Sequence, residues 1–355
     1  MTDFIYESLP ARVIFGTGTR EQLPAEIDRL GAARALVLTT PEQAKEGEAI
    51  SAMIGSRGVA SFHKATMHTP VPVTEEALAV LVHADADVIV AIGGGSTVGL
   101  SKALALRTDL PQIVLPTTYA GSEMTPILGQ TENGVKTTVR CAKVLPEVVL
   151  YDIALSRGLP LRSSINSGLN AIAHAAEALY AKDGNPVLSI MAEASIAAFA
   201  RSLPVLVQDP GDLQARRDAL YGAWLAGSCL AAAGMALHHK LCHTLGGTFD
   251  LPHAETHAVV LPYAMAFNRA GAPDAMAAIA RALKTDDAPR GLRDLARSLG
   301  APLALGELGF AVEDVGRAVE IAVRNPYWNP VAIDAAGIDR LLRAAQSGDE
   351  DYLAS

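Results

Sequence analysis

The sequence predicts an α/β N-terminal domain with a mostly parallel sheet, followed by an all-α C-terminal domain. The first observation is an alternation, over residues 1–157, of short runs rich in valine and isoleucine with amphipathic stretches. The second is that strand-like runs largely disappear over residues 158–355, where the pattern becomes helical. A parallel sheet with helices on both faces produces the first pattern. The chain of 355 residues is long enough for two domains.

Six strand-like runs and three helical stretches make up most of the first domain. Each run is bounded by glycine, proline or aspartate, which is typical of buried strands between turns. The expected strands are 12–16, 35–40, 60–66, 88–96, 112–118 and 147–152. Amphipathic stretches at 19–30, 42–58 and 74–86 lie between the first four strands and are expected to be helices.

Helical periodicity dominates the second domain. Alanine-rich stretches are expected to be helices over 169–181, 186–207, 215–234 and 338–348. Half of all residues are apolar and only 5% are aromatic, a composition that suits closely packed helices. The two patterns change over near residues 155–162, so we expect the domain boundary after residue 157.

Composition also restricts the partners. The net charge of −9 argues against nucleic acid. Three cysteines without paired spacing indicate a reducing compartment rather than a disulfide framework. The first residues lack the basic start and apolar core of a signal peptide, and no apolar run reaches the ~20 residues of a membrane span. We therefore expect a cytoplasmic protein that binds neither nucleic acid nor a membrane.

A glycine-rich turn follows the strand expected at 88–96. Gly93, Gly94 and Gly95 come directly after buried apolar residues, and a helix is expected to start near Ser96. Glycines let a phosphate approach the backbone, and a helix N-terminus offers free N–H groups and positive potential. The alternative is an ordinary tight turn. The motif is not GxGxxG and follows the fourth strand, so a standard Rossmann arrangement is excluded.

Hydroxyl groups follow two neighbouring expected strands. The turn after 112–116 carries Thr117, Thr118 and Ser122. Strand ends of a parallel sheet share one crevice, so these groups are expected to contact the same dinucleotide. Thr39 ends an earlier strand, where an acid would select NADH and repel the phosphate of NADPH. Because threonine is neutral, we expect tolerance of both NADH and NADPH.

Clustered histidines are the main chemical feature of the helical domain. Asn170 and His174 are four residues apart, as are His239 and His243, and His253 follows shortly after. Side chains at this spacing share one helix face, so they can converge on one cavity. A metal-binding cluster would be completed by a carboxylate, and position 170 carries asparagine instead. We therefore expect imidazole chemistry without an acidic partner.

Several motifs together resemble the iron-containing (group III) alcohol dehydrogenase superfamily. They are GGGS at 93–96, PTTYAGSE at 116–123, the helix with Asn170 and His174, and HKLCH with the following LPH at 239–253. The similarity extends from the opening ARVIFGTGTREQLP to the closing RNPYWNP. Within the superfamily the sequence is most similar to the maleylacetate reductase branch. The resemblance implies a dehydroquinate synthase-like fold, a bound NADH or NADPH and a homodimer.

The resemblance also implies where a metal would bind. Matched residue by residue, the ligand positions of the superfamily fall on Asn170, His174, His239 and His253, so the anionic ligand is missing. Gly99 likewise stands where the phosphate loop often carries an acid. Iron(II) without its carboxylate is disfavoured, although three imidazoles can hold zinc. We expect that metal is not required, and that the less negative pocket accepts a small dianionic substrate.

Reduction of the carbon–carbon double bond of maleylacetate to 3-oxoadipate, in the catabolism of aromatic compounds, is the implied reaction. His243 and His253 are expected to contact the substrate and its oxyanion, with His174 and His239 beside them. Asn170, Lys136 and His257 are further candidates for substrate binding, whereas His238 is interpreted as a packing residue. One alternative is a metal-dependent NAD(P) alcohol or polyol dehydrogenase. A remote alternative is a non-catalytic nucleotide-binding module.

Overall fold

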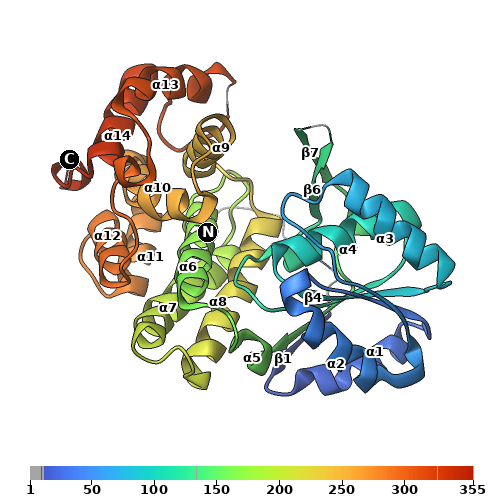
Figure 1. Ribbon diagram of the computed structural model, residues 1–355. Helices are drawn as coiled ribbons and strands as arrows, with labels where there is room; N and C mark the ends of the chain where they lie inside the picture. The colour runs from blue at the N-terminus through green and yellow to red at the C-terminus, as the bar shows by residue number, and fades with distance from the viewer. Residues whose placement is uncertain (1–8, 10–11, 133, 326, 355) are drawn as a thin grey trace. The chain divides into compact units, whose positions relative to one another are not determined.

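The computed structural model describes residues 9, 12–132, 134–325 and 327–354 (Figure 1). These residues form two compact units that divide between Leu159 and Pro160. The sequence places the boundary after residue 157. The two units are described separately below.

A parallel six-stranded sheet forms the centre of the first unit (Figure 1). In spatial order its strands are β1 (Arg12–Gly16), β8 (Val148–Asp152), β5 (Gln112–Pro116), β4 (Val88–Gly93), β2 (Ala35–Leu38) and β3 (Gly58–Phe62). All neighbouring pairs are parallel; Val90, for example, is in register with Val37 and Ile113. The six expected strands and their parallel arrangement are therefore confirmed.

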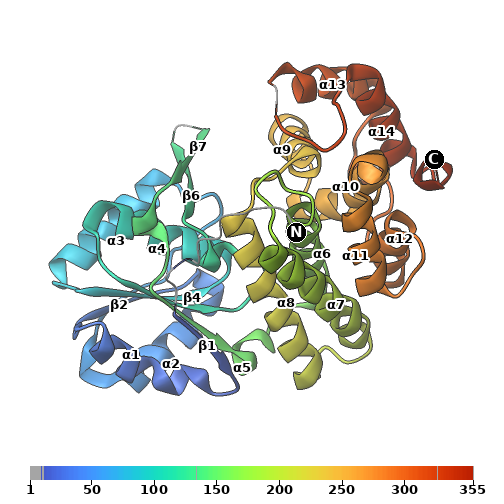
Figure 2. The same cartoon turned by 180° about the vertical axis from the view of Figure 1, so that it is seen from behind.

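Helices cover both faces of this sheet because successive residues of a buried strand point to opposite sides. On one side α1 (Leu23–Arg29) and α2 (Ala44–Ile54) pack against Val37 and its same-face neighbours. On the other side α3 (Val71–His83) and α4 (Gly95–Thr108) pack against Leu36 and Leu38. Both views of the ribbon show these two helical layers (Figures 1 and 2).

An antiparallel hairpin, β6 (Ile127–Glu132) and β7 (Val135–Arg140), is absent from the sequence prediction. Its strands, ILGQTE and VKTTVR, are rich in polar residues and pair along their whole length, from Ile127 with Arg140 to Glu132 with Val135. The Asn-Gly pair at 133–134 is a strong hairpin signal in the sequence. The short, polar strands of this hairpin explain why a search for buried apolar runs missed it.

The second unit is helical (Figure 2). Its helices are α6 (Leu161–Ala178), α7 (Pro186–Gln208), α8 (Leu213–Ala232), α9 (Leu237–Phe249), α10 (His253–Asn268), α11 (Pro273–Leu283), α12 (Ala288–Ser298), α13 (Val315–Arg324) and α14 (Ala335–Ser347). Side chains of Asn185, Asp212 and Asp334 cap three of them by accepting hydrogen bonds from the first helical N–H groups. The short α5 (Ile153–Ser156) ends the first unit.

Glycines allow α7 to pack closely against α6 and α8. A Cβ atom on Gly168 of α6 would lie 2.9 Å from Leu203, and one on Gly222 of α8 would lie 2.9 Å from Phe199. Both partners are fully buried residues of α7. The two glycines therefore let α6, α7 and α8 pack closely against one another.

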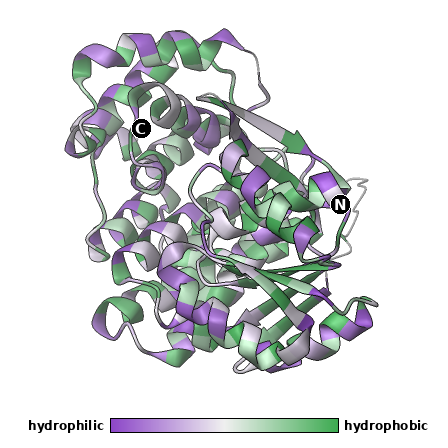
Figure 3. Ribbon diagram, turned by 45° about the vertical axis from the view of Figure 1, so that its right-hand side comes forward, coloured by the Kyte–Doolittle hydropathy of each residue, from purple (hydrophilic) through white to green (hydrophobic). Residues whose placement is uncertain are grey.

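Helix α7 is long and apolar enough to cross a membrane when judged by length and composition alone. The same holds for α8 and α9 if they are taken as one span, although they are bent by 95°. The expectation that no such stretch exists therefore needs correction. Buried residues of α7 such as Phe199 and Leu203 face the other helices, as in a core helix. Hydrophilic and hydrophobic residues are interspersed along the helices (Figure 3).

Asp152 provides a test of how the first unit is held together. Its fully buried carboxylate accepts hydrogen bonds from the backbone N–H groups of Gly18, Arg20 and Ala154 at 3.0–3.2 Å. Replacing Asp152 with alanine leaves these donors unsatisfied, so we expect a loss of about 2–4 kcal/mol in the free energy of unfolding. Urea denaturation followed by circular dichroism measures it. An unchanged midpoint would contradict this role.

Candidate active site

The carboxyl ends of three neighbouring strands gather the residues expected to bind a dinucleotide. Strand β4 lies between β2 and β5, and all three are parallel. The chain leaves β2 towards β3 on one side and β4 towards β5 on the other, and ligands bind at such a reversal. Thr39 follows β2, the glycine loop follows β4, and Thr117 and Thr118 follow β5. Gln43 donates a hydrogen bond to Thr117 over 3.1 Å.

The glycine loop is closely packed at two positions and open at the third. A Cβ atom would lie 2.3 Å from Thr97 Oγ1 if placed on Gly93, and 2.7 Å from Thr118 Cγ2 if placed on Gly94. A Cβ atom on Gly95 would have no neighbour within 4 Å. Helix α4 begins at Gly95 without a side-chain cap, so its first N–H groups are available to an anion.

Lys102 of α4 stabilises the turn that follows β5, and the sequence analysis did not identify this residue. Its buried ammonium donates hydrogen bonds to the carbonyls of Ser122, Thr125 and Ile127 at 2.6–2.9 Å. Burial lowers the pKa of Lys102 to about 7, while the nearby Glu123 opposes this shift. The lysine closes the motif GGGSTVGLSK, which was the available signal.

Two further positions of this unit are closed by neighbouring side chains. The hydroxyl of Thr39 is fully buried and lies 2.7 Å from Nδ1 of His63. A Cβ atom on Gly99, where the superfamily often carries an acid, would lie 2.3 Å from Thr69 Oγ1. Any side chain at position 99 therefore requires Thr69 to move. Lys136, the remaining candidate in this unit, belongs to β7, and its side chain lies outside the described part of the chain.

Six histidines of α6, α9 and α10 come together in the helical unit. They are His174, His238, His239, His243, His253 and His257. The rings of His174 and His239 stack with centroids 5.0 Å apart, and His257 lies 4.9 Å from His239 and 4.5 Å from His253. The ring centroid of His243 is 6.1 Å from that of His239. The structure thus brings together all five histidines expected at the site, and it adds His238.

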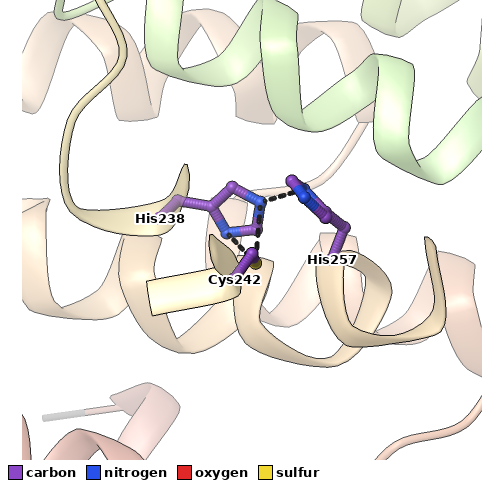
Figure 4. A group of neighbouring side chains, drawn as sticks. All are labelled: His238, Cys242 and His257. Carbon is purple, nitrogen blue, oxygen red and sulfur yellow. Dashed lines mark hydrogen bonds between the residues drawn. The ribbon is translucent and has the colours of Figure 1, made fainter. Parts of the chain in front are cut away.

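His238 is part of this cluster rather than a residue apart from it. Its Nε2 lies 2.9 Å from Nδ1 of His257, and Sγ of Cys242 lies 3.7 Å from the same Nε2 (Figure 4). All three side chains are buried, and their ligand atoms lie within 4.8 Å of one another. Burial, with a smaller contribution from His239, lowers the pKa of His238 to about 3. His238 and its partner His257 are therefore uncharged at neutral pH.

Glu177 contradicts the expectation that the histidines have no acidic neighbour. This fully buried residue of α6 lies three positions after His174, and its Oε2 is 2.5 Å from Nδ1 of His239. Burial raises the pKa of Glu177, but the electrostatic interaction and hydrogen bond with His239 outweigh burial and lower it to about 2. The spacing from His174 was the available signal, but its partner is 62 residues away in sequence.

The buried members of the cluster present unsatisfied polar atoms. Oδ1 of Asn170, Nδ1 of His174, Nε2 of His239 and Nε2 of His257 have no hydrogen-bond partner among the described residues. Burial, followed by the proximity of the other histidines, lowers the pKa of His174 and of His257 well below the usual value. By contrast, His243 and His253 are exposed. The site therefore combines neutral, enclosed lone pairs with two accessible imidazoles.

A metal ion fits part of this arrangement. The unsatisfied atoms of Asn170, His174 and His239 belong to three of the four positions implied by the sequence resemblance. Together with His253 they would form a neutral donor set of one amide oxygen and three imidazoles, which suits zinc better than iron(II). Glu177 is hydrogen-bonded to Nδ1 of His239 and therefore orients that ring from the side opposite Nε2.

Comparisons with known proteins agree with this architecture. Residues 10–153 match the family described as iron-containing alcohol dehydrogenase, and residues 164–346 match the C-terminal part of the Fe-containing alcohol dehydrogenase family. A maleylacetate reductase of Sphingobium indicum is 56% identical over 97% of this chain and 98% of its own length. Its counterpart from Rhizobium sp. strain MTP-10005 is 55% identical over 98% and 99%.

The solved structures give the same result. The crystal structure of maleylacetate reductase from Rhizobium sp. strain MTP-10005 superimposes with a TM-score of 0.96, covering 98% of this chain and 99% of that one at 54% identity. The fold class and the resemblance inferred from the motifs are thereby confirmed. The chain belongs to the iron-containing alcohol dehydrogenase family.

Proposed function

We propose that this protein is a maleylacetate reductase, an oxidoreductase that uses NADH or NADPH to reduce maleylacetate to 3-oxoadipate in the catabolism of aromatic compounds. The observation that carries this proposal is the similarity to maleylacetate reductases at 49–56% identity over nearly the whole chain. The glycine loop at the carboxyl end of β4 supports the proposal that a dinucleotide binds. The neutral Thr39 supports tolerance of both forms.

The histidine cluster supports the chemistry of this reaction. When bound, NAD(P)H supplies a hydride. Addition of hydride to the alkene carbon remote from the ketone converts the conjugated ketone into an enolate, which needs hydrogen-bond donors already in place. The accessible His243 and His253 are proposed to donate to this oxyanion, with His174 and His239 beside them. Asn170 and His257 are proposed to bind the substrate, as is Lys136, and the neighbouring carbon then receives a proton.

We further propose that no metal is required. Asn170 replaces the anionic ligand, and Glu177 is held by His239, so the cluster offers no free carboxylate to a cation. If a metal binds, Asn170, His174, His239 and His253 would hold it and it would supply positive charge for the oxyanion. We also propose a cytoplasmic homodimer without nucleic-acid or membrane partners; the resemblance to the superfamily supports the homodimer, and the net charge of −9 argues against nucleic acid.

The first test follows NADH oxidation by absorbance after addition of maleylacetate, before and after treatment with a chelator. We expect turnover with maleylacetate, and a rate that chelation changes by less than about twofold because no step depends on metal. Metal analysis of the same sample is the control. Loss of turnover on chelation and its recovery with added zinc or iron would contradict metal independence. Oxidation of simple alcohols, with maleylacetate ignored, would instead favour the alcohol dehydrogenase alternative.

A second test replaces His243 with alanine. If His243 donates to the reacting group, kcat should fall by roughly 10²–10⁴ while NADH affinity changes little. Replacement of the exposed His83 at the end of α3 with alanine is the matched control, and it should leave both quantities unchanged. Equal losses of turnover and NADH affinity in the His243 variant would place this side chain elsewhere.

The open position in the glycine loop provides a third test. An alanine at Gly95 meets no protein atom within 4 Å, so it should not lower the thermal midpoint. It would occupy the space that a phosphate needs, and we expect the Kd for NADH to rise by about tenfold or more, that is by ~1.4 kcal/mol or more. The same change at exposed Gly158, which is equally unhindered, is the control. Unchanged NADH affinity in the Gly95 variant would exclude a phosphate from this loop.

A further inference from the structure

The buried carboxylate of Glu177 lies where the end of α6 meets the start of α9. It accepts hydrogen bonds from Nδ1 of His239 at 2.5 Å, from the backbone N–H groups of Ala236 and His238 at 3.1 and 2.8 Å, and from the hydroxyl of Tyr180 at 3.1 Å. Four donors to one carboxylate compensate for its complete burial. A group this costly to bury without partners is expected to have a specific task.

One pair of these bonds fixes the start of α9. Ala236 is the N-cap of this helix, and its own side chain makes no capping hydrogen bond. The first N–H groups of a helix have no partner within the helix, and an anion is favourable there because of the helix dipole. Glu177 thus caps α9 from α6 and determines where the following residues of α9, His239 and His243, are placed.

Another bond fixes the proton on His239. A carboxylate only accepts hydrogen bonds, so Nδ1 of His239 must carry the hydrogen and Nε2 must face away from Glu177. Nε2 of His239 is buried without a partner among the described residues, and the ring stacks on His174 at 5.0 Å. The hydrogen bond therefore directs one defined nitrogen towards the unsatisfied atoms of the cluster.

We propose that Glu177 is a positioning residue: it selects the Nδ1–H form of His239, orients that ring, and caps the helix that carries His239 and His243. This inference deepens the proposed function because it assigns the acidic support of the reacting histidines to α6. The inference applies whether a substrate or a cation binds to the cluster, since the binding of either depends on the orientation of Nε2 of His239.

A chain of polar side chains links Glu177 to the segment after α13. Tyr180, which donates to Glu177, is also hydrogen-bonded to Asn268. Asn268 and Asn329 exchange two hydrogen bonds at 3.1 and 2.6 Å, and Asn329 also donates to the carbonyl of Val331. The RNPYWNP motif is thereby connected to the histidine cluster through side chains. Within this chain, Glu177 is the residue that contacts the imidazoles, through His239.

The test compares Glu177→Gln with Asp183→Asn. Asp183 is a suitable control because its carboxylate accepts from the backbone N–H of Gly234, in the segment just before α9, and that hydrogen-bonded site is exposed. For Glu177→Gln we expect kcat with maleylacetate to fall roughly 10–100-fold with the KM for NADH changed less than about threefold. Asp183→Asn should retain kcat within about threefold. Equal losses of kcat in both variants would contradict the proposal, because Glu177 would then only hold the segment before α9 in place.

A second measurement needs no enzymatic activity. Nitrogen-15 NMR of the histidine-labelled wild-type protein, assigned by His239→Gln, reports which ring nitrogen of His239 carries hydrogen. We expect a protonated Nδ1 and an unprotonated Nε2, and a mixture of forms in Glu177→Gln. A wild-type ring with hydrogen on Nε2 and none on Nδ1 would overturn the inference. If maleylacetate is not turned over at all, the NMR result still decides the role of Glu177 independently of the proposed function.

Discussion

Burial of one carboxylate among imidazole rings is the constraint on which the helical unit depends. Glu177 cannot remain charged in the interior without its four donors, and these donors come from the start of α9, from His239 and from Tyr180. Satisfying the carboxylate therefore determines both the position of α9 and the orientation of a histidine.

The same burial sets the chemical character of the site. Desolvation and mutual repulsion lower the pKa of His174, His238 and His257, so these rings are neutral at physiological pH. The single nearby carboxylate stays ionised but is fully engaged by its four hydrogen bonds, and position 170 adds an amide instead of a second acid. A pocket with this charge distribution repels a dianionic substrate less than one lined by free carboxylates. This is the physical link between the substitution at Asn170 and the proposed substrate.

Sequence patterns predict the parts of this protein that depend on local order. The six strands, the helical second half and the convergence of the five expected histidines all follow from periodicity and spacing. Features that depend on contacts between distant segments were missed: Glu177 finds His239 across 62 residues, and Lys102 holds a turn more than 20 residues away. His238 was interpreted as packing because a single histidine is more often a satisfied core residue than a functional one; the nearby α10 gives it a partner in His257.

Transfer of deuterium tests the central claim most directly, namely that hydride reaches an alkene carbon while the imidazole cluster holds the resulting enolate. The protein would be incubated with maleylacetate and NADH carrying deuterium at the transferred position, and the product examined by NMR and mass spectrometry. The account predicts 3-oxoadipate with an intact ketone and one deuterium on the carbon next to the carboxylate remote from that ketone. A hydroxy acid with deuterium on the carbinol carbon would contradict it, because the carbonyl would then be the group reduced.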